Sequence, residues 1–231
     1  MFSIYLFTLV TFLWGLIATP VSIGLAQKFR LLDIPGGRKK HRSIMPRGAG
    51  IVLWSGYLLW ALFVGNPGVE VPYIATGATI VFIVGYMDDM HPLPPVMRLF
   101  FHLAAAAWVS YNLIDGMDGL CLTMTLITSV IAAAFAGNPA VWMPVAGLVF
   151  GVLLWNFPQP RTFLGDGGST LLGYICSSHL AWSIFPDLFG KGFFSIAAVL
   201  FFIGGIPVID TLVAMTRRIL TKKYPFSPDR G

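Results

Sequence analysis

Long runs of apolar residues, separated by short polar stretches, dominate the chain. A membrane-spanning helix needs about 17–25 mainly apolar residues to cross a hydrocarbon core near 30 Å thick. Seven runs are close to this length: residues 2–26, 50–65, 71–87, 120–136, 140–157, 169–185 and 193–215. The pattern therefore predicts an all-α, polytopic transmembrane helical bundle with seven clear spans.

Residues 98–111 form a further apolar stretch that is too short for a comfortable crossing. As a helix it would extend only about 21 Å, which is less than the hydrocarbon thickness. The prediction is a short or re-entrant segment at this position, or the loss of a stretch that would have completed one crossing and begun another.

Composition agrees with a membrane location. The 231 residues are 56% hydrophobic and only 11% charged, with a mean hydropathy of +0.78, far from the average of soluble proteins. Cys121 and Cys176 lie within apolar runs, where thiols usually serve packing. No disulfide framework and no nucleic-acid partner is expected.

Lysine and arginine residues indicate the orientation, because short loops rich in them stay on the cytoplasmic side. The loop between the first two runs carries Lys28, Arg30, Arg38, Lys39, Lys40, Arg42 and Arg47. This places the N-terminus outside and the end of the third run inside. The same basic cluster is also suited to anionic lipid headgroups or phosphates, although any polytopic protein needs such a loop for its topology.

Aspartates are concentrated in three short stretches that adjoin apolar runs. A charge at the bilayer centre costs about 2.5–3.5 kcal/mol on insertion scales, so such acids indicate ion or substrate handling. The first stretch is the pair Asp88 and Asp89. Adjacent carboxylates repel each other, which indicates either a nearby cation or an ordinary solvated helix end.

In the second stretch, Asn112, Asp115 and Asp118 recur at intervals of three and would share one face of a helix. The glycines beside them would let a nucleotide or sugar approach the backbone closely. The alternative is an Asx turn that caps the helix starting near Leu120.

The third stretch joins Arg161 and Asp166 to a glycine-rich turn directly before an apolar run. Backbone N–H groups at such a turn bind anions, and Asp166 could hold a bridging metal ion, so this is a candidate diphosphate site. The alternative is a plain helix N-cap by Asp166 or Ser169.

These stretches belong to a longer set of motifs. The set comprises Asp88-Asp89, NLIDGMDGL at 112–120, FLGDGGST at 163–170, IPVID at 206–210 and PFSPDR at 225–230, together with the loop at 33–50. Together they resemble the polyprenyl-phosphate N-acetylhexosamine-1-phosphate transferases (glycosyltransferase family 4), most closely the bacterial members that use UDP-GlcNAc and undecaprenyl phosphate. The resemblance covers nearly the whole chain, which is expected to form a single domain, 1–231.

The resemblance implies a reaction and a location. N-Acetylhexosamine 1-phosphate, with GlcNAc as the first candidate sugar, would pass from a UDP-sugar to undecaprenyl phosphate with release of UMP. This is the first membrane step of cell-envelope polysaccharide synthesis, for lipopolysaccharide O-antigen or cell wall. The protein is expected in a bacterial inner membrane among lipids, with a cytoplasmic active site, and the family pattern is compatible with a homodimer.

The same resemblance assigns roles to residues. Asp166 and Asn112 would bind Mg²⁺, or Mn²⁺ in its place, on the donor diphosphate. Asp88 and Asp89 would position or deprotonate the lipid phosphate, and the acids of the second stretch would line the nucleotide–sugar site. The implied catalytic residues are Asp88, Asp89, Asp115, Asp118 and Asp166. The implied substrate-binding residues are Lys39, Lys40, His41, Arg42, Asn112, Arg161, Gly165 and Gly167.

Three departures from the family pattern bear on activity. The acidic pair usually has a third aspartate after it, whereas this chain continues Met90-His91-Pro92. The family also has a helical hairpin before the Asn-containing motif, and it continues beyond PFSPDR into a histidine cluster and further helices. The cluster is not expected to be replaced by His41, His91, His102 or His179. A shortened, catalytically inactive membrane scaffold is therefore the alternative function.

Two other classes of protein are weaker alternatives. An ion-coupled transporter would also retain intramembrane acids, but it usually shows paired inverted halves, and no internal repeat is visible in the sequence. An intramembrane prenyltransferase would need a second, more widely spaced aspartate motif, and it would leave the glycine-rich turn without a role.

Overall fold

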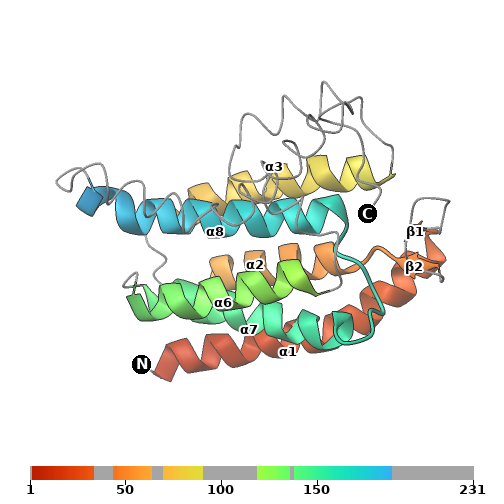
Figure 1. Cartoon of the computed structure of the whole chain (residues 1–231), viewed down its shortest axis with the longest axis horizontal. Helices are drawn as coiled ribbons and strands as arrows, with labels where there is room; N and C mark the ends of the chain where they lie inside the picture. The colour runs from red at the N-terminus through yellow and green to blue at the C-terminus, as the bar shows by residue number, and fades with distance from the viewer. Residues whose placement is uncertain (1, 34–43, 64–69, 91–118, 136–137, 189–231) are drawn as a thin grey trace, which may run out of the picture.

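The computed structural model describes residues 2–33, 44–63, 70–90, 119–135 and 138–188 (Figure 1). Almost all of them are helical. The elements are α1 (Phe2–Lys28), β1 (Leu32–Asp33), β2 (Met45–Pro46), α2 (Ala49–Phe63), α3 (Glu70–Met90), α6 (Leu120–Phe135), α7 (Pro139–Asn156) and α8 (Gly165–Leu188).

The all-α prediction is confirmed for this part of the chain, whereas seven clear spans are not. By length and composition, three described helices are suited to crossing a membrane: Ser3–Lys28, Glu70–Met90 and Pro139–Asn156. The apolar helices α2 and α6 are shorter than a full span, at 15 and 16 residues. The predicted span at 193–215 and the short segment at 98–111 lie outside the described residues.

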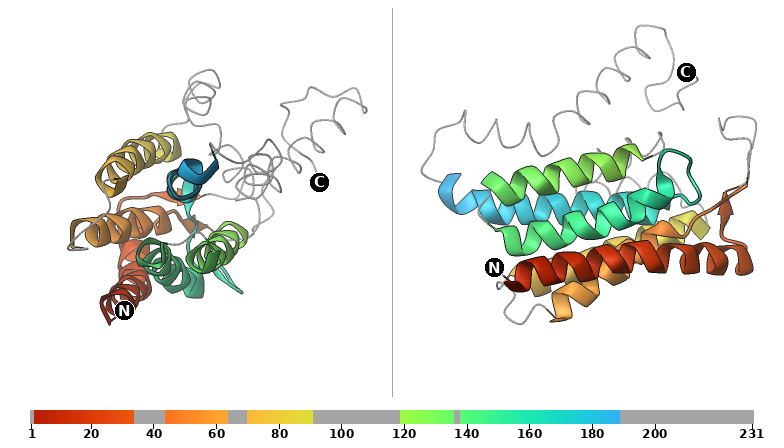
Figure 2. Two further views of the ribbon diagram at one scale, coloured as in Figure 1. Left: turned by 90° about the vertical axis from the view of Figure 1, so that its left-hand side faces the viewer. Right: turned by 90° about the horizontal axis from the view of Figure 1, so that it is seen from below.

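The helices lie side by side in a bundle, with α1, α3 and α7 running in one direction and α2, α6 and α8 in the other (Figures 1 and 2). Helix α1 packs chiefly along α7, and α3 packs along α8. Helix α2 contacts all four of these helices and therefore lies in the middle of the bundle. With this alternation, the starts of α2, α6 and α8 lie at the same end as the last turns of α1, α3 and α7, on the right of Figure 1.

Glycines permit the close packing of α1 against α7. A side chain at Gly147 would approach the backbone oxygen of Thr8 to 2.5 Å, and one at Gly151 would collide with the backbone of Phe12. Small residues of this kind let membrane helices approach closely, and van der Waals packing then stabilises the pair. Thr11 adds a hydrogen bond across the interface, because its hydroxyl donates to the carbonyl oxygen of Pro144 at 2.7 Å.

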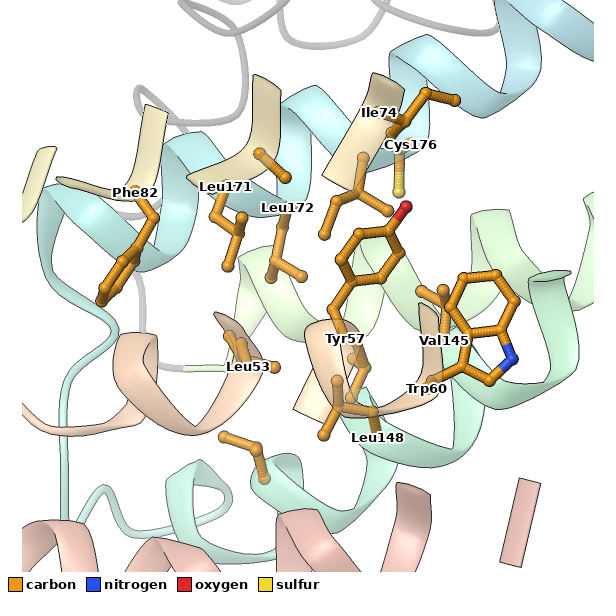
Figure 3. Close-up of a cluster of buried hydrophobic side chains, with 14 of the residues drawn as sticks. Leu53, Tyr57, Trp60, Ile74, Phe82, Val145, Leu148, Leu171, Leu172 and Cys176 are labelled. Atoms are coloured by element: carbon orange, nitrogen blue, oxygen red, sulfur yellow. The ribbon is translucent and has the colours of Figure 1, made fainter. Parts of the chain in front are cut away.

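The core of the bundle is formed by side chains from α2, α3, α6, α7 and α8, part of which Figure 3 shows. It includes Leu53, Tyr57 and Trp60 of α2, Ile74 and Phe82 of α3, Val145 and Leu148 of α7, and Leu171, Leu172 and Cys176 of α8. Both cysteines, Cys121 and Cys176, are buried and no disulfide joins them. The packing role predicted for them is confirmed.

Candidate active site

A short β-hairpin shapes the connection between α1 and α2. Strand β1 pairs antiparallel with β2, so that Asp33 lies opposite Met45. Arg47, directly after β2, forms a parallel bridge with Phe163, whose N–H donates to the carbonyl oxygen of Pro46 at 2.9 Å. The connection before α2 and the connection before α8 are therefore joined through their backbones.

The side chain of Thr162 also joins the connection before α8 to the connection before α2. Its hydroxyl donates to the carbonyl oxygen of Pro46 at 3.0 Å and accepts from the N–H of Gly48 at 3.3 Å. The amide of Asn156, at the end of α7, donates to the carbonyl oxygen of Thr162 at 2.5 Å. Thr162 and Asn156 are both buried, so these hydrogen bonds set where α8 begins relative to α2 and α7.

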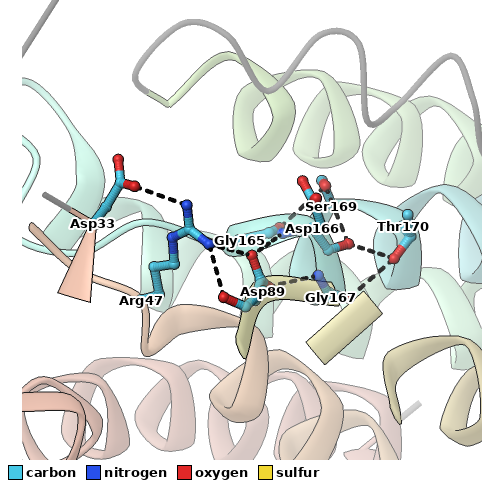
Figure 4. A network of polar contacts seen from close by, with 8 residues as sticks. All are labelled: Asp33, Arg47, Asp89, Gly165, Asp166, Gly167, Ser169 and Thr170. Atoms are coloured by element: carbon cyan, nitrogen blue, oxygen red, sulfur yellow. Dashed lines mark hydrogen bonds and ion pairs between the residues drawn. The ribbon is translucent and has the colours of Figure 1, made fainter. Parts of the chain in front are cut away.

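Arg47 lies between two buried carboxylates (Figure 4). Its Nη2 is 2.7 Å from Oδ1 of Asp33, and its Nη1 is 2.9 Å from Oδ1 of Asp89. The side chains of Asp33 and Asp89 are only 7% and 8% exposed, whereas that of Arg47 is 29% exposed. Partial burial would by itself lower the pKa of Arg47, but the nearby charges of Asp89 and Asp33 outweigh it and raise that pKa above its ordinary value. The guanidinium therefore stays charged.

Asp89, in the last turn of α3, also binds the start of α8. Its Oδ1 accepts from the N–H of Asp166 at 3.0 Å, and its Oδ2 accepts from the N–H of Gly167 at 3.0 Å. These two N–H groups lie in the first turn of α8, where backbone donors have no partner within the helix. Asp89 and the glycine-rich turn, which are far apart in the sequence, are thus brought together.

Gly165 allows this contact. It has a φ of +69°, in the left-handed region that favours glycine, and a Cβ atom built on it would collide with the carboxylate of Asp89. The turn therefore wraps around a carboxylate from another helix. The sequence analysis expected a diphosphate at the N–H groups of this turn, whereas in the structure the N–H groups of Asp166 and Gly167 donate to the carboxylate of Asp89.

Asp166 stands in the first turn of α8, beside the acids of α3. Its carbonyl oxygen accepts from the hydroxyl of Thr170, and Ser169 donates in the same way to the carbonyl oxygen of Gly165 at 3.1 Å. The described residues contain no group of three or more His, Cys, Asp or Glu side chains arranged to hold a metal ion.

The other predicted site residues are placed as follows. Arg161 is exposed, and its guanidinium lies 5.3 Å from the ring centroid of Trp155 in a cation–π contact. Gly119, directly after the second acidic stretch, lies against Phe157 near the end of α7, and so at the same end of the bundle. Seven predicted residues lie outside the described ranges: Lys39, Lys40, His41, Arg42, Asn112, Asp115 and Asp118.

Two residues of the network were missed as site residues by the sequence analysis. Arg47 was counted among the basic residues of the first loop, and Asp33 was given no role. A signal was available for Arg47, because it directly follows Pro46 and stands apart from the basic run at 38–42. Nothing in the local pattern distinguishes Asp33.

His179 was not expected to replace the family's histidine cluster, and its position agrees with that. It lies 14 residues into α8 from Gly165, roughly 21 Å along the helix axis. There it is buried, and its Nε2 is 2.8 Å from the hydroxyl of Tyr57. His179 therefore belongs to the core of the bundle and not to the acidic network.

The fold and this network define a helical protein with membrane-length apolar helices and a buried acidic network at one end of the bundle. Comparison with known proteins agrees with the motifs: residues 108–183 match the model of the family described as glycosyl transferase family 4. The resemblance to that family predicted from the sequence is confirmed.

Individual relatives extend the match over most of the chain. A Bacillus subtilis protein described as a "probable undecaprenyl-phosphate N-acetylglucosaminyl 1-phosphate transferase" is 27% identical, over 96% of this chain and 74% of its own length. An undecaprenyl-phosphate alpha-N-acetylglucosaminyl 1-phosphate transferase of Thermotoga maritima is 26% identical, over 91% and 74%. A decaprenyl-phosphate N-acetylglucosaminephosphotransferase of Mycolicibacterium smegmatis is 24% identical, over 89% and 68%.

Proposed function

We propose that the protein transfers N-acetylhexosamine 1-phosphate, with GlcNAc as the first candidate sugar, from a UDP-sugar to undecaprenyl phosphate and releases UMP. The names of its relatives support a transferase that acts on a polyprenyl phosphate. The observation that carries the proposal is the contact between Asp89 and the first turn of α8, because it joins two of the acidic motifs at one end of the bundle.

The chemistry explains why acids and cations should meet at that end. Phosphoryl transfer brings two anionic phosphates together, so catalysis depends on positioning and on the stabilisation of negative charge. We assign the donor diphosphate to the region of Asp166 and the lipid phosphate to the end of α3 near Asp88. The cations Lys39, Lys40, His41, Arg42 and Arg161 are the proposed phosphate contacts, and Asp115 and Asp118 would line the nucleotide–sugar site.

Mg²⁺ fits the residues that are present. It is usually held by one or two protein carboxylates, with substrate phosphates and water completing an octahedron of oxygen atoms. Asp166 provides one carboxylate at the start of α8, and Asn112 would add an amide oxygen from the second acidic stretch. When bound, the ion would neutralise charge on the diphosphate, while the residues of this chain orient the two substrates.

The location follows from the same proposal. Undecaprenyl phosphate is a membrane lipid, so the end of the bundle that carries Asp166 should lie at a membrane surface. The basic first loop adjoins this end through Arg47 and favours the cytoplasmic side of a bacterial inner membrane. The product would be a lipid-linked sugar diphosphate for cell-envelope polysaccharide synthesis.

The test is transfer of labelled sugar 1-phosphate from UDP-GlcNAc to undecaprenyl phosphate by the purified protein, with Mg²⁺ and with EDTA. We expect product that depends on Mg²⁺ and falls by about 10²–10³-fold in Asp166→Asn, the loss typical when one preorganised charge-stabilising group is removed. Glu70→Gln is the matched control, because Glu70 is a buried acid at the opposite end of α3.

The outcomes separate the alternatives. Activity in Glu70→Gln but not in Asp166→Asn would support the proposal. A well-folded protein that makes no lipid-linked product from any UDP-N-acetylhexosamine would overturn it and leave the inactive membrane scaffold as the better interpretation.

A further inference from the structure

Both carboxylate oxygens of Asp89 are occupied by protein donors (Figure 4). Oδ1 accepts from Nη1 of Arg47 at 2.9 Å and from the N–H of Asp166 at 3.0 Å, and Oδ2 accepts from the N–H of Gly167 at 3.0 Å. The side chain is only 8% exposed. A general base needs to reach the proton that it removes, directly or through one water molecule. Asp89 would have to release a partner to do so.

Arg47 is held in place from its other side. Its Nη2 donates to Oδ1 of Asp33 at 2.7 Å, while its Nη1 also donates to the backbone oxygen of Asp89 at 3.2 Å. Asp33 is in turn fixed by the pairing of β1 with β2. A planar guanidinium is suited to such a bridge, because its donors diverge in a rigid fork that a lysine cannot reproduce.

The turn that receives Asp89 is shaped for a carboxylate. Gly165 leaves no room for a side chain at this point, and the N–H groups of Asp166 and Gly167 lie at the positive end of the helix dipole. Each connection in the series Asp33, Arg47, Asp89 and the first turn of α8 is made by a short polar contact. The series ends at Asp166.

From this geometry we propose that Asp89, Arg47 and Asp33 are positioning residues that hold the first turn of α8, and with it Asp166, in place for the reaction. The inference deepens the proposed function and rests on it for the role of Asp166. It changes the expectation for Asp89, which acts through α8 and does not take a proton from the lipid phosphate.

Amide hydrogen exchange tests the network without any need for turnover. The first N–H groups of a helix have no partner within the helix, so protection of Asp166 and Gly167 reports directly on the carboxylate of Asp89. In the purified full chain we expect residue-resolved exchange at these two amides to become at least tenfold faster in Asp89→Asn, Arg47→Ala and Asp33→Ala. Glu70→Gln should leave it unchanged.

Kinetics then test whether the positioning matters for transfer. Arg47→Ala and Asp33→Ala should each lower kcat at least tenfold, and the double variant should be no worse than the poorer single variant, because both remove the same bridge. Arg47→Lys should recover part of the loss. In Asp89→Asn, residual turnover should keep the shape of the wild-type pH profile. If Asp89 were the general base, the fall in rate at low pH would come from its protonation and would disappear in this variant.

Two results would overturn the proposal. One is exchange at Asp166 and Gly167 that is as fast in the wild type as in the variants. The other is an Asp89→Asn protein that loses all turnover while these amides remain protected, because Asp89 would then act chemically.

If Asp89→Asn fails to fold, Arg47→Ala and Asp33→Ala carry the test. If the wild type shows no transferase activity, the proposed function fails, and hydrogen exchange still decides whether the network holds α8.

Discussion

At the scale of single residues, the site depends on one carboxylate received by a turn that has no side chain in the way. Gly165 combines a positive φ with close contact to Asp89, so both the backbone conformation and the space require glycine. This is a stronger requirement than flexibility alone. A change at Gly165 should act on Asp89 and on the start of α8 together.

We therefore predict that Gly165→Ala destabilises the protein. The left-handed conformation costs a non-glycine residue about 1–2 kcal/mol, and the new methyl group would also displace the carboxylate of Asp89. Thermal unfolding in detergent, followed by tryptophan fluorescence, measures the loss. Gly24→Ala is the control, because a Cβ atom at Gly24 meets nothing within 4 Å. Equal stability of the two variants would contradict the prediction.

The hydrogen bond between Tyr57 and His179 gives a second prediction at this scale. Both residues are buried in the bundle, and their Oη and Nε2 atoms are 2.8 Å apart. Hydrogen bonds between side chains of membrane helices average about 0.6 kcal/mol in double-mutant cycles, with a maximum near 1.7 kcal/mol. A cycle of Tyr57→Phe and His179→Leu, read by unfolding, should give a coupling in this range. Transferase activity should persist in Tyr57→Phe, because the pair lies far from Asp166.

The sequence analysis singled out two acids of this network, Asp89 and Asp166, and missed the third acid, Asp33, and the arginine between them, Arg47. Asp88, Asp89 and Asp166 stand out because a charged side chain near the membrane core costs free energy, and such residues therefore indicate a functional role. Arg47 is harder to recognise, because its position after Pro46 is the one signal that separates it from the other basic residues of a loop that topology alone would explain. Asp33 and Arg47 become a pair only when the hairpin and the start of α8 have formed, and no local spacing encodes that contact.

At the scale of helices and strands, the apolar runs predicted where the helices lie but not where their polar ends begin. The predicted run at 140–157 corresponds closely to α7 (Pro139–Asn156), whereas the run at 169–185 became α8 (Gly165–Leu188). The difference is the turn Gly165-Asp166-Gly167-Gly168, which is too polar and glycine-rich to extend an apolar run. It joins the helix because Asp89 binds its N–H groups. The two-residue strands β1 and β2 are too short to show any periodicity.

The contact between α1 and α7 yields a prediction for whole helices. A leucine at position 151 would enter the backbone of α1 near Phe12, so the two helices would have to separate along their length. Overpacking of this kind typically costs about 1–3 kcal/mol. Gly151→Leu should therefore lower the unfolding temperature in detergent well below that of Gly24→Leu, the same change at an open position. A similar effect of both substitutions would show that this crossing is not tightly packed.

At the scale of the whole molecule, alternation of helix direction collects the chemistry at one end. The ends of α1, α3 and α7 meet the starts of α2, α6 and α8 there, and Arg47, Asp89, Asp166 and Gly119 all lie at that end. The count of crossings alone did not predict this arrangement, because residues 98–111 are too short for a comfortable span and left the side of the later motifs open; only three described helices have full membrane length and character. Alternation requires only that successive helices reverse direction, so it survives errors in their exact lengths.

The orientation of the bundle in the membrane is the prediction that belongs to this scale. The basic first loop favours the cytoplasm, so the end that carries Asp166 should face inward and the end at Asn138 should face outward. Single cysteines can report this in intact cells with a membrane-impermeant maleimide. Gln159→Cys lies in the exposed connection before α8 and Asn138→Cys at the opposite end of α7, while the native Cys121 and Cys176 are buried.

We expect the reagent to label Asn138→Cys in intact cells and to label Gln159→Cys only after the membrane is opened. The physical reason is that basic residues in short loops resist translocation, and the basic loop is joined to the Asp166 end through Arg47. Labelling of Gln159→Cys from outside would place the acidic network on the far side of the membrane from cytoplasmic UDP-sugars. It would thus count against both the orientation and the proposed transfer reaction.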